Sequence, residues 1–117
     1  MEEEKVIYNY FTGRHSEVVS DVLRSIGAYT REDRVRSFKI GITNDPQRRF
    51  QEEYASYYDK MIVLYRSSSI NSVSTLEDEL VEHSSELADN IIAGGGGNYG
   101  APPYFLYVVI RFWRQRG

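Results

Sequence analysis

Residues 38–49 (FKIGITNDPQRR) combine side chains that could bind a phosphate group. The first six alternate between apolar and polar or small types, which is typical of a half-buried strand. Gly41 lies within this strand and indicates a point where another backbone or a ligand comes close. Asp45 can cap the helix that follows, and Pro46 suits its first turn. The stretch therefore predicts a glycine-bearing strand next to a helix that begins with two arginines, a geometry that suits a phosphate.

Four basic side chains near this stretch could contact the phosphate. Arg49 lies one turn into the predicted helix, and its planar guanidinium can bind two phosphate oxygens at once. Arg48 is its competitor, and Arg36 lies in the same basic region. Lys39 falls on the strand face opposite the apolar residues, where it could hold phosphate or a nucleophilic water. For each of these residues taken alone, an ordinary solvated surface position is the simpler interpretation.

Glu77 is the acidic residue that differs from its neighbours. A helix is predicted from a cap at Ser72 or Ser74 to about residue 89, and at 100° per residue Glu77 falls within its apolar stripe. A carboxylate on an apolar face must be paired, hydrogen-bonded or bound to a cation, because an isolated buried charge is very costly. A salt bridge to an arginine at the edge of the core and a role in a functional site are equal alternatives.

Tyr8 and Tyr10 are candidate general bases on the first predicted strand. A tyrosine beside basic groups can act as a base once its pKa is lowered. The chain has ten tyrosines, so most must be core or rim residues, and that is the simpler interpretation for each of these two. The two histidines show no metal-ligand spacing, and the glycine run at 94–97 matches no phosphate-binding loop.

Hydrophobic periodicity predicts the elements that must position these residues. Their order, β-α-β-α-β-α-β, gives an α/β fold in which a small central mixed sheet is flanked by helices. The predicted strands are at 5–11, 38–43, 60–66 and 104–112, and the one at 60–66 is central. The first predicted helix is capped by Ser16 and stopped by Gly27, and the last one carries Glu77. The helix between them follows the strand at 38–43, and its Phe50, Tyr54 and Tyr57 share one face.

Length and composition indicate one globular domain of 117 residues, with 26% charged and 41% hydrophobic residues. The absence of cysteine excludes a disulfide framework and thiolate metal sites. No apolar run approaches 18 residues and no signal-peptide pattern is present, so we expect an intracellular protein that does not enter membranes, in the cytoplasm, a nucleus or a host cell.

The charge distribution is uneven although the net charge is only −3. Basic residues gather between 31 and 49 and again in the stretch 111–117, whereas acidic residues concentrate between 52 and 89. A basic face on an acidic body is compatible with local phosphate contacts. On charge alone, an ordinary solvated surface is the preferred interpretation.

Taken together, these features resemble the GIY-YIG nuclease superfamily. Five segments carry the resemblance, and their order along the chain agrees with it. Val6 stands where the family has the glycine of GIY, and Lys39 where it has the tyrosine of YIG. The segments are Val6-Ile7-Tyr8, Lys39-Ile40-Gly41, Asp45-Pro46-Gln47-Arg48-Arg49-Phe50, Leu76-Glu77-Asp78-Glu79-Leu80-Val81, and Asn90 followed by the glycine run.

The resemblance implies a single domain over 1–117, with about 12–37 as an insertion holding an extra helix between the two motif strands. It implies that Arg49 binds the scissile phosphate and that Glu77 holds one Mg²⁺ or Mn²⁺ ion. Tyr8 would orient or deprotonate the attacking water, and Asn90 would support the site. Tyr10 and Lys39 remain open as the base. Gly41, Arg48 and Arg36 would contact the substrate.

The function expected from this resemblance is metal-dependent hydrolysis of DNA phosphodiester bonds. Branched or flap DNA is as plausible a substrate as a defined sequence, and a homodimer or a partner protein could supply specificity. Two alternatives remain on the same fold: a nucleic-acid-binding module without catalysis, and a protein-interaction domain that uses a tyrosine-rich surface.

Overall fold

The computed structural model describes residues 4–83 and 100–113. Four strands and three helices follow one another in the predicted order, which confirms the α/β fold class. A short π-helical segment, η1, continues directly from the second helix. The elements are β1 (Val6–Phe11), α1 (His15–Thr30), β2 (Val35–Thr43), α2 (Pro46–Arg49), η1 (Phe50–Tyr54), β3 (Lys60–Ser67), α3 (Ile70–Glu82) and β4 (Tyr104–Phe112).

The strands form one mixed sheet in the order β1-β3-β4-β2. β1 pairs with β3 in parallel, whereas β4 pairs antiparallel with both β3 and β2. The two strands that carry the GIY-like and YIG-like segments therefore lie at opposite edges of the sheet. Helix α1 connects these two edges, and β3 and β4 separate them.

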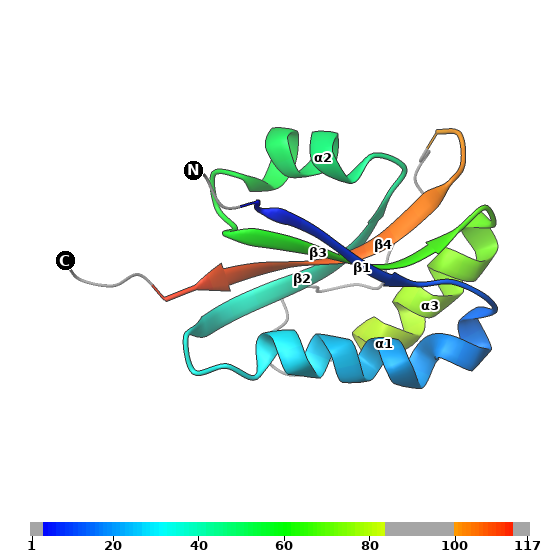
Figure 1. Cartoon of the computed structure of the whole chain (residues 1–117), viewed down its shortest axis with the longest axis horizontal. Helices are drawn as coiled ribbons and strands as arrows, with labels where there is room; N and C mark the ends of the chain where they lie inside the picture. Colours follow the sequence, from blue (N-terminus) through cyan, green and yellow to red (C-terminus); the bar gives the residue numbers. More distant parts are fainter. Residues whose placement is uncertain (1–3, 84–99, 114–117) are drawn as a thin grey trace.

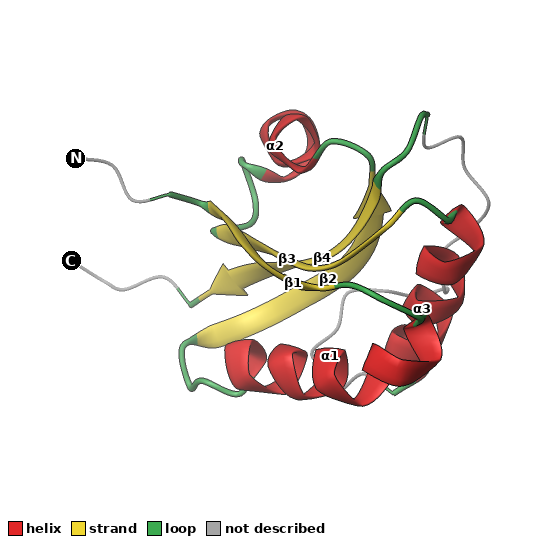
Figure 2. Ribbon diagram, turned by 45° about the vertical axis from the view of Figure 1, so that its right-hand side comes forward, coloured by secondary structure: helices red, strands yellow, loops and turns green. Residues whose placement is uncertain are grey.

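Helices cover both faces of the sheet (Figures 1 and 2). α1 and α3 lie against one face, and α2 with η1 lies over the other, which we call the α2 face. Two buried clusters correspond to these two layers. The larger contains apolar residues of α1 and α3 packed on the sheet, and the smaller contains Phe50 and Tyr54 packed on Val63 and Tyr107.

The two central strands are the most hydrophobic segments of the chain. Residues 61–65 of β3 and 106–110 of β4 are all buried, because helices cover both faces of these strands. This confirms the predicted central strand at 60–66, and β4 has the predicted bounds. In the edge strand β2, Phe38, Ile40 and Ile42 are buried on the α1 and α3 side, as the alternation predicts.

Helix α1 differs from the prediction at both ends. Its N-cap residue is Arg14 rather than Ser16, and Gly27 lies inside the helix rather than at its end. The last turn is held by polar contacts to carbonyls that a helix end would leave unpaired. Thr30 Oγ1 donates to the Ile26 carbonyl (2.7 Å), and both the backbone N and Nε of Arg31 donate to the Gly27 carbonyl (3.0 Å each).

Helix α2 begins as predicted and then widens. Asp45 Oδ1 accepts from the Arg48 backbone N–H (3.2 Å), and Pro46 occupies the first helical turn. From Phe50 the chain takes the wider π-helical turn, which ends at Tyr54. Phe50 and Tyr54 are buried, as predicted, but Tyr57 lies beyond the helix and is 45% exposed. The prediction that Tyr57 shares their face is therefore wrong.

Helix α3 begins one turn earlier than predicted. Ser69 is the N-cap, and its hydroxyl accepts from the Ser72 backbone N–H (3.2 Å), so neither Ser72 nor Ser74 is the cap. The described helix ends at Glu82, and the rest of the predicted segment lies outside the described residues. Among the helices that the structure describes, none is long and apolar enough to cross a membrane.

Candidate functional site

Arg49 lies at the end of α2, where the helix passes over the sheet (Figure 1). Its side chain is 30% exposed, whereas that of its neighbour Arg48 is 72% exposed. Arg49 Nη1 lies 3.4 Å from Glu53 Oε2, one helical turn further along. The Tyr54 hydroxyl is a further hydrogen-bonding partner, and Tyr107 lies close enough to affect the Arg49 charge. Arg49 is thus a partly buried guanidinium held against tyrosines.

Two tyrosines beneath Arg49 are joined by their hydroxyl groups. The Tyr54 and Tyr107 oxygens lie 2.7 Å apart, and their rings meet edge to face with centroids 5.7 Å apart. Burial, reinforced by Tyr54, raises the pKa of Tyr107 well above its ordinary value. Its hydroxyl therefore remains protonated at neutral pH, where it can donate or accept a hydrogen bond but cannot act as a base.

Gly41 provides the space that Tyr107 occupies. The two residues are paired across β2 and β4. A Cβ atom on Gly41 would lie 2.6 Å from Tyr107 Cζ, far inside van der Waals contact. The close approach that the sequence predicts at Gly41 is therefore made by the Tyr107 ring, whose hydroxyl bonds to that of Tyr54.

Arg49 remains positively charged in this setting. Partial burial lowers its pKa, but Tyr107, Glu53 and Tyr54 outweigh this effect, and the net pKa is raised. Tyr107 acts on that pKa only when it is itself ionised, so Glu53 is the charged partner at neutral pH. Because Glu53 is half exposed, an anion from solution can compete with it for the guanidinium.

A small polar hollow of about 150 Å³ lies beside this guanidinium. Arg48 and Arg49 both line it, and each is paired with a glutamate one turn away, Arg48 with Glu52 at 3.2 Å. The hollow therefore contains both signs of charge. Its remaining lining residues are Thr43 at the end of β2 and Asn44 and Asp45 from the loop before α2.

Lys39 and Tyr8 also lie on the α2 face, at different distances from Arg49. Lys39 Nζ is 5.9 Å from the centre of the Tyr54 ring. Tyr8 is in register with Gly41 across the sheet, because Tyr8 pairs with Val63, Val63 with Tyr107, and Tyr107 with Gly41. Three strand spacings therefore separate Tyr8 from Gly41, which is roughly 14 Å.

Tyr8 belongs to a separate aromatic group at the β1 edge. Its ring and that of Tyr10 both pack edge to face on Phe105, with centroids 6.5 and 6.2 Å away. Both tyrosines are exposed, at 47% and 42%. The tyrosines near Arg49 are instead Tyr54, which bonds to it, and Tyr107, which bonds to Tyr54; neither was selected as a site residue from the sequence. Tyr107 is placed there by the pairing of β2 with β4, which the local sequence does not contain, whereas Tyr54 belongs to η1, directly after Arg49.

Glu77 lies in the other helical layer. It is on α3, which packs on the sheet face opposite α2 (Figure 2). Its predicted burial is confirmed, with 4% of the residue exposed beside Val73, Leu76 and Leu80. The residue makes an interaction within the protein. Among the described residues, no group of three or more acidic or histidine side chains could hold a metal ion.

The remaining predicted residues lie elsewhere. Arg36 is exposed in the first part of β2, and its guanidinium lies 5.1 Å from the Trp113 ring centre. Asn90 and the glycine run lie outside the described residues. The structure thus brings Arg49, Lys39 and Gly41 together, with Tyr8 on the same face but distant, and it places Glu77 in the opposite layer.

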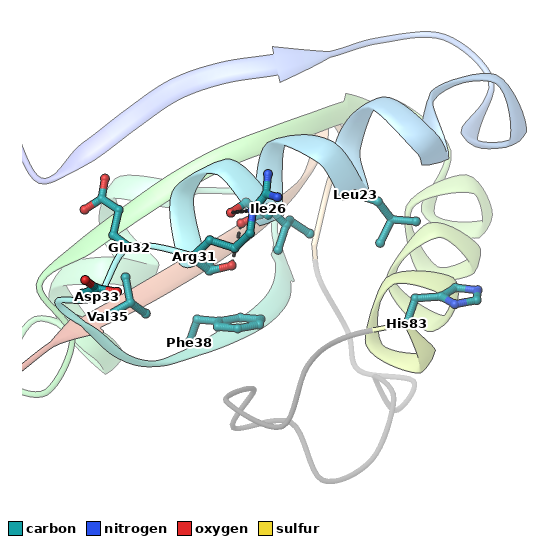
Figure 3. Close-up of a pocket in the computed structure, with 10 residues that line it drawn as sticks. Leu23, Ile26, Arg31, Glu32, Asp33, Val35, Phe38 and His83 are labelled. Carbon is teal, nitrogen blue, oxygen red and sulfur yellow. Dashed lines mark hydrogen bonds between the residues drawn. The ribbon is translucent and has the colours of Figure 1, made fainter.

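A larger hollow of about 510 Å³ lies on the α1 and α3 side of the sheet. Figure 3 shows its apolar wall, formed by Leu23 and Ile26 of α1 and by Phe38 of β2, with His83, the C-cap residue of α3, at its rim. Arg31 at its edge is held by the carbonyl of Gly27 (3.0 Å). The hollow contains none of the predicted site residues.

Comparison of the chain with family models, with curated proteins and with solved structures finds no match. The function of the chain is therefore inferred from the residues and contacts of the α2 face.

Proposed function

We propose that the chain binds the phosphodiester backbone of DNA on the α2 face and hydrolyses it with a divalent metal ion, as a GIY-YIG-type endonuclease does. The observation that carries this proposal is the setting of Arg49. Its guanidinium is partly desolvated, held by Glu53 and by the Tyr54 hydroxyl, and still reachable from solution. A preorganised charge of this kind stabilises a phosphate more strongly than a mobile surface arginine, because less order must be created on binding.

Lys39 adds a second positive charge to the same face. Together with Arg48 and Arg49, Lys39 balances the three carboxylates of the hollow, so a phosphodiester held by Arg49 would meet a mixed surface although the chain as a whole is acidic. The Tyr54 and Tyr107 hydroxyls are buried and bonded to each other, so they would act on the phosphate through the charge of Arg49 rather than by direct contact.

Glu77 is the residue that would hold the metal. Mg²⁺ is often bound by one or two carboxylates, with water and substrate phosphate oxygens completing its shell, so a single glutamate could anchor it only where solvent and substrate reach that carboxylate. When bound, the ion would neutralise charge on the phosphoryl oxygens and lower the pKa of an attacking water. Glu77 is nearly fully buried and lies in the layer opposite Arg49, so hydrolysis at one shared site requires α3 to bring this carboxylate to the phosphate.

The position of Glu77 favours a second function, nucleic-acid binding without cleavage. In that case Arg49 and Lys39 would bind phosphate, and Glu77 would be a structural residue of α3. Both functions use the same phosphate contact, and they differ only in the role of the metal.

A cleavage assay separates the two functions. End-labelled single-stranded, duplex and flap DNA are incubated with the protein in Mg²⁺, Mn²⁺ or EDTA, beside the Arg49→Ala and Glu77→Gln variants. Hydrolysis requires products that depend on metal and disappear in both variants, while Glu77→Gln retains DNA binding. Intact DNA with every metal, together with unchanged binding in Glu77→Gln, would leave binding without cleavage as the function.

A further inference from the structure

Three cations on the α2 face each lie next to a tyrosine, two of them over its ring and one at its hydroxyl. Arg111 Cζ is 3.9 Å from the centre of the Tyr57 ring, and Lys39 Nζ is 5.9 Å from that of Tyr54. Arg49 also contacts Tyr54 through its hydroxyl. We call these three cations and two tyrosines the cation–tyrosine row.

The tyrosines of this row belong to one connected aromatic series. Tyr58 joins them, with its ring centroid 5.5 Å from that of Tyr54 and 4.9 Å from that of Tyr57. Tyr54 and Tyr58 are buried, whereas Tyr57 is 45% exposed. The series is thus part of the core at one end and presents an accessible ring at the other.

The cations follow the register of β2 and β4. Gly41 pairs with Tyr107 beneath Arg49, Lys39 pairs with Val109, and Ser37 pairs with Arg111. The three positions are two residues apart, which is about 7 Å per step along a strand. Phosphates repeat about every 3.4 Å along each strand of duplex DNA, so one step corresponds to roughly two stacked nucleotides, and to fewer when the strand is extended.

Trp113 extends the row past the end of β4. It is two positions beyond Arg111, so strand alternation directs it to the same side, and it is 58% exposed. The Arg36 guanidinium lies 5.1 Å from the Trp113 ring centre. Arg111 is held by packing, since its Cζ atom lies 3.9 Å from the centre of the Tyr57 ring and its Nε atom is buried. Exposed rings and positive charges therefore continue from Arg49 to this end of the sheet.

We propose that the cation–tyrosine row and Trp113 bind a single-stranded segment of nucleic acid, whose bases stack on Tyr57 and Trp113 while its phosphates contact Arg111, Lys39 and Arg49. This inference rests on the proposed function, because it extends the nucleic acid away from the Arg49 phosphate. Alternating rings and cations are the features that bind single strands without sequence preference. A duplex offers the phosphates but keeps its bases stacked and paired, so it cannot use the two exposed rings.

The chain contains a single tryptophan, so its fluorescence reports on Trp113 alone. The protein in EDTA and low salt is titrated with a mixed-sequence DNA oligonucleotide, with RNA of the same sequence, and with the matching DNA duplex. Saturable quenching of Trp113 by the single strands, and not by the duplex, is the expected result. Equal quenching by the duplex, or unchanged fluorescence while anisotropy shows that the single strand is bound, would overturn the inference.

Substitutions on the row test the stacking separately. Tyr57→Ala is expected to weaken single-strand binding about fivefold or more, and Tyr57→Phe is expected to restore it, because stacking requires the ring and not the hydroxyl. Tyr10→Ala is the matched control, since Tyr10 is similarly exposed but lies at the other edge of the sheet. Equal affinities for Tyr57→Ala and Tyr10→Ala would contradict the inference.

The two proposals fail in different ways. Suppose that Arg49→Ala abolishes binding while Tyr57→Ala and Arg111→Gln do not weaken it. The nucleic acid then does not follow the rest of the row beyond Arg49, and the phosphate contact of the proposed function stands. If Arg49→Ala leaves binding unchanged, the proposed function fails whatever the row does. Thermal unfolding of each variant shows whether a loss of binding reflects a loss of fold.

Discussion

Arg49 and Glu53 form an ion pair one helical turn apart, with Nη1 3.4 Å from Oε2, at the point where we place the phosphate. Glu53 is the more exposed partner, at 53% against 30% for Arg49. The carboxylate therefore occupies the same guanidinium that a phosphate would use, and binding must displace it. At the proposed site, Glu53 would make the phosphate contact weaker than Arg49 alone would allow.

Replacing Glu53 with Gln is expected to strengthen DNA binding. Exposed pairs of this kind are worth about 0.2–1 kcal/mol, so the gain in affinity should be up to roughly fivefold at low salt and smaller at high salt. Fluorescence anisotropy with a labelled oligonucleotide in EDTA measures it. The matched control is Glu52→Gln, which frees the more exposed Arg48. A larger gain from Glu52→Gln than from Glu53→Gln would place the phosphate on Arg48.

Gly41→Ala is expected to destabilise the protein, because the new Cβ would collide with the buried Tyr107 ring. Overpacking of this kind costs about 1–3 kcal/mol in the free energy of unfolding, which urea denaturation measures. Gly27→Ala is the opposite control. Its Cβ would lie no closer than 3.5 Å to the Arg31 side chain inside α1, so alanine should be neutral or stabilise the helix by up to about 1 kcal/mol. Equal stabilities of these two variants would contradict the packing described for Gly41.

Tyr107 should make stability depend on pH under alkaline conditions. Its pKa is raised in the folded protein, chiefly by burial and then by Tyr54, above the ordinary value of 10.0. Above about pH 10 the unfolded chain loses this proton while the folded chain keeps it, so unfolding becomes more favourable as pH rises. The free energy of unfolding should fall by up to about 1.4 kcal/mol per pH unit from this one group, and the effect is absent below pH 10.

Tyr107→Phe should remove this part of the alkaline slope, whereas Tyr8→Phe, at an exposed position, should leave it unchanged. Urea denaturation at pH 8, 10 and 11 gives the slopes. A Tyr107→Phe variant that retains the full slope would show that Tyr107 ionises as readily in the folded protein as in the unfolded chain.

Much of the fold follows from local sequence, and the site does so only in part. The alternation around Lys39 and the apolar runs of β3 and β4 predict strands that the structure confirms, because burial on one or two faces leaves a local pattern. The cap at Asp45 is equally local. The end of α1 could not be predicted from Gly27, because contacts of Thr30 and Arg31 extend the helix by a further turn.

Which residues meet at the site depends on how segments far apart in the sequence pack and pair. Helical phase predicts that Glu77 is buried, and it is, but phase cannot tell which face of the sheet its helix covers. In the same way, Gly41 predicts a close approach without naming Tyr107, since only the register of β2 against β4 brings the two together. Tyr8 was selected by its neighbours in sequence, whereas the strand order places it at the edge remote from β2.

The central claim is that Arg49 is the phosphate contact, and the dissociation constant of labelled DNA for Arg49→Ala tests it most directly. Measured at low salt in EDTA, the variant is expected to bind at least about tenfold more weakly than the unmodified protein, because a charge-assisted hydrogen bond is lost. Arg48→Ala, which removes the same charge from a more exposed position, should weaken binding only about two- to threefold. Equal affinities for the two variants, or no loss in Arg49→Ala, would contradict the account.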